Sequence, residues 1–175
     1  MLSIEIYRKI YNLLDKVNPL SYDCGKSCGA VCCRNDSFAD DAEPYIYLLP
    51  GENKYLEAAG ADIEIRRELR KKHNLPESYG DHVYTAVCKG PENCDRRFRP
   101  IQCRSFPLWP YFTDNDELIL TYYDDELPYV CPLIYDRQKL SDDFIRATYE
   151  AWDILSGDES VKDLIRLYSS VPLRP

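Results

Sequence analysis

The residues most able to do chemistry in this sequence are its eight cysteines. Four of them lie within ten residues, between positions 24 and 33, and the other four follow in two short segments further along the chain. Thiolate sulfur selects zinc, copper(I) and iron–sulfur clusters, and structural zinc and cubane clusters are commonly held by four cysteines. The sequence therefore predicts two four-thiolate sites that hold zinc or an iron–sulfur cluster, with these ligands: Cys24, Cys28, Cys32, Cys33, Cys88, Cys94, Cys103 and Cys131.

The adjacent pair Cys32 and Cys33 is a special case among these ligands. Neighbouring side chains diverge, so two consecutive thiolates rarely serve one ion. We expect the pair to be shared between two sites. The alternative is that one member lies beside the metal without binding it, or is a reactive thiol.

Three other uses of the cysteines compete with metal binding. They could pack as small apolar side chains, but four within ten residues are too many for packing alone. They could form disulfides, which a reducing compartment disfavours. One could be a catalytic nucleophile, yet neither histidine, His73 or His82, lies at a ligand spacing or an activating position near a cysteine. We expect both histidines at the surface or in hydrogen bonds.

Length and composition indicate one domain over 1–175, which is long enough to bury a core without disulfide staples. We expect a cysteine-cluster core over about 20–135 and a helical part over about 137–170. The first residues show no basic region followed by an apolar one, and no apolar run reaches the ~18 residues of a membrane span. The expected location is the reduced cytoplasm, where clustered cysteines favour metal chemistry.

The net charge of −8 and the pI near 4.8 argue against nucleic acid or a membrane surface as a partner, because phosphate affinity comes mainly from Lys and Arg. One basic cluster stands out between Cys94 and Cys103, formed by Arg96, Arg97 and Arg99 with Arg104 close behind. These guanidinium groups would offset the net charge of about −2 on a four-thiolate site. The alternative is a solvated loop paired with the many carboxylates.

The elements expected to position the cysteines are short. Apolar residues at helical spacing predict an amphipathic helix over 4–17, and two more helical stripes follow from Leu140 to Leu155 and from Val161 to Tyr168. Strands are predicted at 44–50, 84–88 and 117–123, with a brief helix at 51–60. Residues 62–73 fit either a strand or a helix. The fold class is therefore α+β, with a small irregular centre organised by metal.

Proline and glycine predict the local structure of two further segments. Three prolines between Arg99 and Pro110 predict an extended, rigid path that carries Cys103. Gly25 and Gly29 disfavour a regular helix in the first cysteine segment and permit tight turns that aim thiolates inward.

The order of the cysteine blocks resembles the YkgJ-like cysteine-cluster family, described as a zinc- or iron-chelating domain. The resemblance covers about residues 20–135 and depends on these blocks: Cys24 to Cys33, Leu49-Pro50-Gly51-Glu52, Cys88 to Cys94, Arg99-Pro100-Ile101-Gln102-Cys103-Arg104-Ser105-Phe106-Pro107, and Cys131-Pro132. Three residues stand before the cysteine pair, where the family usually has two. The resemblance implies metal or iron–sulfur binding by these cysteines in a cytosolic protein. A similar motif in flagellin lysine N-methylases implies a methyltransferase-related activity as an alternative.

The first functional hypothesis is thus a cysteine-cluster metal-binding protein with structural or redox use. The second is a metal- or cluster-dependent enzyme that binds an anionic substrate through the arginines of the basic cluster. The third is a protein-interaction module, because the run Trp109-Pro110-Tyr111-Phe112 looks exposed and the chain has 15 tyrosines. The partner of such a module is not specified by the sequence.

Overall fold

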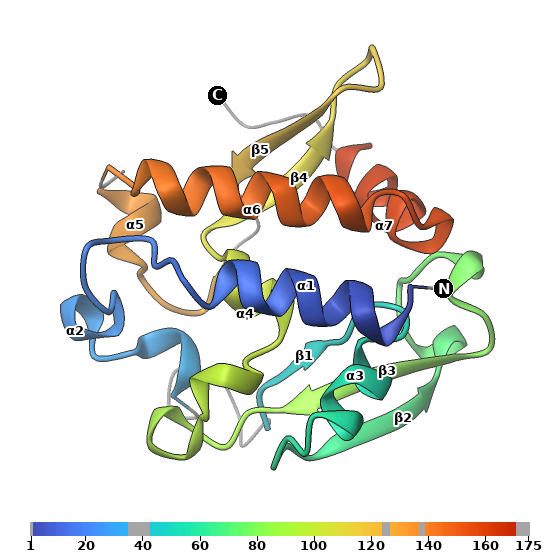
Figure 1. Cartoon of the computed structure of the whole chain (residues 1–175), viewed down its shortest axis with the longest axis horizontal. Helices are drawn as coiled ribbons and strands as arrows, with labels where there is room; N and C mark the ends of the chain where they lie inside the picture. The colour runs from blue at the N-terminus through green and yellow to red at the C-terminus, as the bar shows by residue number, and fades with distance from the viewer. Residues whose placement is uncertain (1, 35–42, 124–126, 137–138, 171–175) are drawn as a thin grey trace.

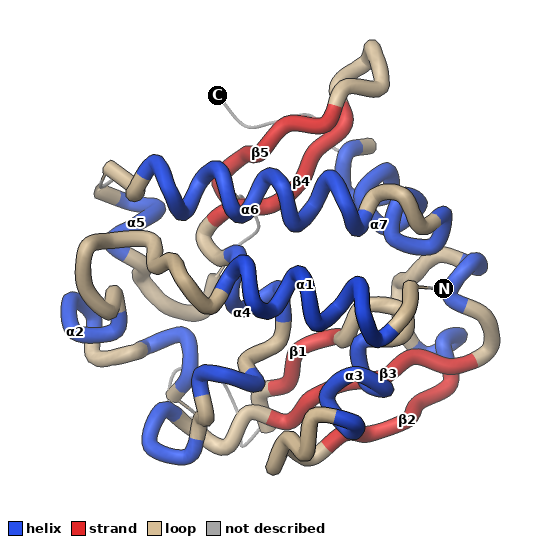
Figure 2. The backbone as a smooth tube through the Cα atoms, in the orientation of Figure 1, coloured by secondary structure: helices blue, strands red, loops and turns tan. Residues whose placement is uncertain are grey.

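The computed structural model describes residues 2–34, 43–123, 127–136 and 139–170, and it has the expected α+β architecture. Figures 1 and 2 show long helices above a small sheet, with a separate hairpin at the upper edge. The helices are α1 (Ile4–Leu14), α2 (Gly25–Cys28), α3 (Glu52–Ala58), α4 (Ile101–Ser105), α5 (Pro132–Tyr135), α6 (Asp142–Leu155) and α7 (Glu159–Ser169). The strands are β1 (Tyr45–Tyr47), β2 (Ile65–Leu69), β3 (His82–Val87), β4 (Leu108–Phe112) and β5 (Leu118–Tyr122).

Helix α1 forms the centre of the core. The Ser3 side chain caps it by accepting a hydrogen bond of 3.3 Å from the backbone N–H of Ile6. Its buried face combines apolar and tyrosine side chains, among them Tyr7 and Ile10, which are fully buried. This face packs between α3 and α6, and α6 runs antiparallel to α1 in Figure 1. Burial of this stripe fixes the N-terminal helix on the C-terminal one.

The two sheets are antiparallel. One has the order β1-β3-β2, so the segment that left strand and helix open, 62–73, contains strand β2. The other is the hairpin of β4 and β5. Because β3 ends at Val87, the next residue, Cys88, leaves the sheet at its edge as expected from the sequence. The central strand of this sheet therefore ends directly before one of the cysteines.

Two local predictions were wrong. Instead of an extended path, residues 101–105 form helix α4, and Cys103 lies inside it. Proline is tolerated at the start of a helix, and Pro100 occupies the N-cap position while Pro107 lies beyond the end. The prolines thus bound a helix rather than exclude one. Likewise the first cysteine segment contains a turn of helix, α2, which Gly29 ends in the left-handed conformation at φ 65°.

The aromatic run that looked exposed is also packed. It forms strand β4, in which Leu108, Pro110 and Phe112 are buried. Trp109 lies against Trp152 of α6, with ring centroids 5.4 Å apart. The run therefore helps to hold the hairpin on the helices and loses its support as an interaction surface.

Candidate metal centre

Four cysteines from separate parts of the chain gather around one arginine, Arg99. Cys33 ends a short 3₁₀ helix, Val31–Cys33, and Cys88 follows β3. Cys94 follows a second 3₁₀ turn, Pro91–Asn93, and Cys103 belongs to α4. Cys88 Sγ donates a long hydrogen bond of 3.8 Å to the carbonyl oxygen of Cys33. This contact joins the end of β3 to the first cysteine segment. We call these four cysteines the Arg99 group.

Arg99 is a partly buried arginine whose guanidinium lies among cysteines. Burial works against its charge, but Cys94, Cys33 and Cys103, in their thiolate form, raise the pKa of its guanidinium. It interacts with Cys94 through a side-chain hydrogen bond. Its Nε is buried and has no hydrogen-bond partner among the described residues. No carboxylate among the residues that the structure describes forms an ion pair with Arg99.

The other arginines of the basic cluster are engaged elsewhere. Arg96 forms an ion pair with Asp23, and Arg97 forms one with Asp95, at 2.7 Å. Both pairs lie at the surface, where they contribute little to stability. The interpretation as a solvated loop paired with carboxylates therefore holds for Arg96 and Arg97. Only Arg99 lies among the thiols as the charge-offset interpretation requires.

Arg104 fixes the loop that carries Arg99. Its side chain is 7% exposed, and its guanidinium donates hydrogen bonds of 2.7 Å to the backbone carbonyls of Arg96, Arg97 and Arg99. It also lies over the ring of Tyr11, 4.8 Å from the centroid, in a cation–π contact. The loop between Cys94 and Cys103 is thus tied to helix α1.

Glu52 positions the helix that carries Cys103, and sequence reasoning assigned it no role. It is fully buried at the start of α3. Its Oε1 accepts hydrogen bonds of 2.8 Å from the Ile101 backbone N–H and the Tyr11 hydroxyl, and its Oε2 accepts one of 2.9 Å from the Leu49 N–H. Burial raises the pKa of this carboxyl despite the three donors. Glu52 belongs to the block Leu49-Pro50-Gly51-Glu52 that contributes to the family resemblance, but the sequence does not indicate its contacts with α1 and α4.

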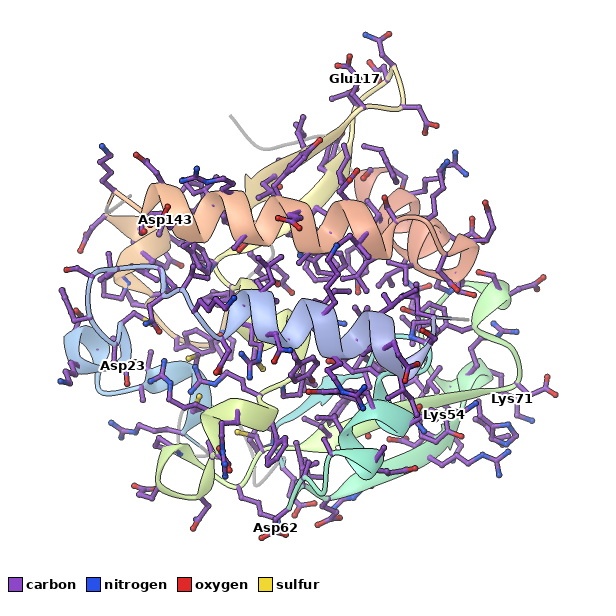
Figure 3. All side chains as sticks on the ribbon, in the orientation of Figure 1. Asp23, Lys54, Asp62, Lys71, Glu117 and Asp143 are labelled. Atoms are coloured by element: carbon purple, nitrogen blue, oxygen red, sulfur yellow. The ribbon has the colours of Figure 1, made fainter. Side chains whose placement is uncertain are left out.

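The remaining cysteines form a second group near α2 and α5. Cys24 and Cys131 contact the same apolar cluster, which also contains Leu133 and Phe144. Cys28 Sγ lies 3.8 Å from the carbonyl oxygen of Cys24. Burial and the neighbouring charges, Cys28 and Cys131 among them, raise the pKa of Cys24. We call Cys24, Cys28 and Cys131 the α2–α5 group. In Figure 3 the sulfur atoms lie on the side of the molecule where Asp23 is labelled.

Cys32 is the exposed member of the eight cysteines, and it lines the same cavity as the Arg99 group. Its Sγ is 3.8 Å from the Sγ of Cys33. Two thiolates on one tetrahedral zinc ion, each about 2.3 Å from the metal, are separated by about the same distance. The pair can therefore face one centre, and its sharing between two centres stays a prediction.

A cavity of about 250 Å³ opens beside the Arg99 group. Its lining contains the four cysteines of that group together with Cys32 and Arg99. The rest of the wall is largely apolar and comes from β1, β3 and the loops around them, with Ile46, Ile63 and Ala86 as examples. Cysteines from four separate segments therefore meet at one hollow.

Several of the thiols have a raised pKa, which favours their protonated form: those of Cys24, Cys33, Cys88, Cys103 and Cys131. The contact with Cys32 raises the pKa of Cys33 to about 11, and burial raises the pKa of Cys103 and of Cys131. Cysteine ligands of a metal must be thiolates, so a metal bound at these thiols would release protons.

The donor chemistry fits zinc or an iron–sulfur cluster, since every member of both groups is a cysteine. In the described ranges, however, no three Cys, His, Asp or Glu side chains converge as ligands of one ion. The fold brings the cysteines to one cavity, and a coordination shell there would require their side chains to rotate. The two histidines stay out of these groups as expected: His73 binds Tyr47 at 2.7 Å and Glu68 at 3.2 Å, and His82 contacts Arg67.

Comparisons with family models, curated proteins and solved structures give no match for this chain. Among the residues that the structure describes, no helix has the length and apolar character needed to cross a membrane.

Proposed function

We propose that this chain is a cysteine-cluster metal-binding protein that chelates zinc or an iron–sulfur cluster through its eight cysteines. One centre uses the Arg99 group, and the other uses the α2–α5 group, with Cys32 available to complete either. The use of the metal is structural or redox. The order of cysteine blocks, which resembles the YkgJ-like family, is the sequence observation that supports the proposal.

Arg99 is the single structural observation that carries it. Arg99 is partly buried. A cation that is largely removed from water needs a counter-charge, because transfer of an unpaired ion into the interior is very unfavourable. Within the described residues Arg99 has thiols as its nearest charged or polar neighbours, and Asp23 interacts with it electrostatically without forming an ion pair. Neutral thiols cannot supply the missing charge, whereas four thiolates on zinc or on a cubane cluster carry a net charge of about −2. The charge of Arg99 therefore matches a metal-loaded centre better than a metal-free one.

The test is metal analysis of protein produced without oxygen, with both iron and zinc supplied. About two metal centres per chain are expected. Zinc without colour indicates a structural role, whereas iron with acid-labile sulfide and broad absorbance near ~400 nm indicates a cluster. Cys103→Ala removes the first centre and Cys24→Ala the second, each lowering the metal content by about half. Ser27→Ala, within the first cysteine segment, is the matched control and keeps the full content. Folded wild-type protein without bound metal would contradict the proposal.

A metal- or cluster-dependent enzyme is the second candidate, favoured by the cavity beside the Arg99 group. Such an enzyme keeps a ligand position open for substrate. X-ray absorption on the loaded protein distinguishes the two functions: a shell closed by sulfur at every metal supports the structural or redox role, and an exchangeable light-atom ligand supports catalysis.

A further inference from the structure

Strand β2 forms an outer edge of the sheet with the order β1-β3-β2, and Figures 1 and 2 show it at the lower border of the molecule. The Val87 N–H donates a hydrogen bond of 2.9 Å to the Glu64 carbonyl oxygen, just before β2. The Arg70 N–H, just after β2, donates one of 2.9 Å to the Asp81 carbonyl oxygen. Both bonds fit the single antiparallel register of β2 on β3, so the even-numbered positions of β2 are the ones that bond to β3.

The odd-numbered positions of β2, Ile65, Arg67 and Leu69, therefore direct their N–H and C=O groups toward the outer edge. Among the described residues, no other backbone segment bonds to these groups. Arg67 is exposed, and Leu69 is 40% exposed although it is apolar. An open row of alternating donors and acceptors can pair with an added strand.

This edge is basic in an otherwise acidic protein. Positions 64–73 contain five Lys or Arg residues and two Glu, whereas the whole chain has a net charge of −8. Arg66 forms ion pairs with two glutamates, and Arg70 donates to two backbone carbonyls. The other three, Arg67, Lys71 and Lys72, are exposed, and no carboxylate of the described residues forms an ion pair with them. Arg67 contacts a histidine ring, which supplies no negative charge. Figure 3 shows Lys71 at the periphery of the molecule.

The charges along the edge decide which kind of strand fits it. A second copy of this chain, paired through the same edge, would bring like charges together, and like charges that face each other across strands are destabilising. Charged edges are a means by which proteins avoid this self-association. A nucleic acid backbone presents acceptors to the edge N–H groups but leaves the edge carbonyls without donors. A peptide strand with acidic side chains matches both the backbone groups and the charge.

We propose that the outer edge of β2 binds an extended acidic segment of a partner protein as an added antiparallel strand. Side chains directly opposite each other in an antiparallel pair lie on the same face. The partner residues opposite Ile65 and Leu69 are therefore apolar, and the one opposite Arg67 is acidic. Further acidic residues, at the N-terminal end of the segment, reach Lys71 and Lys72. This edge contains no cysteine, so the proposal does not depend on metal binding.

The test uses a synthetic peptide with this pattern, acetyl-Asp-Asp-Ser-Val-Thr-Glu-Thr-Val-Ser-amide, and NMR titration measures its affinity. On binding, amide hydrogen exchange is expected to slow at Ile65, Arg67 and Leu69 and to stay unchanged at Arg66 and Glu68, which already bond to β3. A peptide with Asn and Gln in place of the acidic residues is expected to bind at least about tenfold more weakly. Equal binding of the two peptides overturns the acidic class.

Two N-methylated forms of the acidic peptide test the backbone pairing. N-methylation of its glutamate removes an N–H that faces β2, and it abolishes binding. N-methylation of the threonine before that glutamate removes an N–H that faces away from β2, and it weakens binding much less. Equal binding of the two methylated peptides overturns strand addition.

Two variants of the protein locate the site. Lys71→Glu reverses one charge and keeps every backbone group of the edge, and it is expected to lower the affinity for the acidic peptide about tenfold. Lys16→Glu makes the same change at an exposed position after α1 and leaves the affinity nearly unchanged. Equal affinities of the two variants overturn the proposed location. Tighter binding of an oligothymidylate or of phosphatidylserine vesicles overturns the choice of partner, as does wild-type protein that does not bind the acidic peptide.

Discussion

The Oε1 atom of Glu52 accepts a hydrogen bond of 2.8 Å from the backbone N–H of Ile101. Ile101 is the first residue of helix α4, and Cys103 lies two positions further along that helix. A buried carboxylate at the start of α3 therefore fixes a cysteine of the Arg99 group. The same oxygen binds the Tyr11 hydroxyl, so helix α1 is part of this connection.

Glu52→Gln is expected to destabilise the fold. An amide nitrogen replaces one oxygen, so either the Leu49 N–H or the two donors on Oε1 face a group that cannot accept. Leaving a buried donor unpaired lowers the free energy of unfolding by about 1–3 kcal/mol. Urea denaturation measures the loss. Glu57→Gln on the exposed face of α3 is the matched control and is expected to change stability by less than about 0.5 kcal/mol. Equal stability of the two variants would show that the Glu52 contacts are unimportant.

The contribution of Glu52 is expected to depend on pH. Burial raises its pKa in the folded protein above the unfolded value of about 4.3. The folded state then binds this proton more tightly, so the contribution is fully present below the unfolded pKa and is lost as pH rises through the folded pKa. The difference in unfolding free energy between wild type and Glu52→Gln therefore shrinks with rising pH. Denaturation of both proteins across that range measures it, and metal loss in acid affects both alike. A difference that grows with pH would show that the pKa of Glu52 is lowered in the folded protein, not raised.

Arg104→Lys is expected to loosen the loop that carries Arg99. Lysine keeps the charge but cannot donate to three carbonyls in the fixed geometry of a guanidinium. The expected loss is about 2–3 kcal/mol in the free energy of unfolding, together with faster transfer of metal to a chelator. Arg146→Lys, at an exposed ion pair with Asp143, is the matched control with little effect. A variant as stable as wild type would show that the charge alone suffices.

Arg99→Met is expected to weaken metal binding without removing a ligand. Loss of a group that supports metal ligands typically lowers affinity by about 10–100-fold. Competition with a coloured chelator measures the affinity. Arg97→Met, at an exposed position next to Asp95, removes the same charge outside the group and is expected to leave the affinity nearly unchanged. Equal effects of the two substitutions would indicate a general charge effect instead of a specific one.

Removal of the metal is expected to lower the melting temperature, because binding free energy becomes folding free energy when the site is structural. Near-UV circular dichroism and thermal denaturation before and after chelation measure the change. The Cys103→Ala variant should resemble the chelated protein in part. Chelated protein that keeps both its near-UV signal and its melting temperature would contradict a structural role, although a redox role would remain.

Much of the fold followed from the sequence because periodic apolar patterns report directly on local structure. The stripes that became α1, α6 and α7 and the strand at 117–123 were all identified. The sequence does not reveal helix α4, because proline disfavours a helix interior, whereas Pro100 stands at the N-cap, before the first turn. The segment 62–73 stayed undecided because its pairing with β3, which makes it a strand, is a long-range contact.

For the candidate site, the sequence by itself determined the donors: eight cysteines, with spacings that indicate thiolate metal chemistry, and a basic cluster between two of them. Only the tertiary structure decided which of these residues meet. It brought Cys33 and Cys88 together, placed Arg99 among thiols, and paired Arg96 and Arg97 with carboxylates. The physical reason is that residue types and spacing define what a side chain can bind, whereas its neighbours and burial arise from contacts between distant segments.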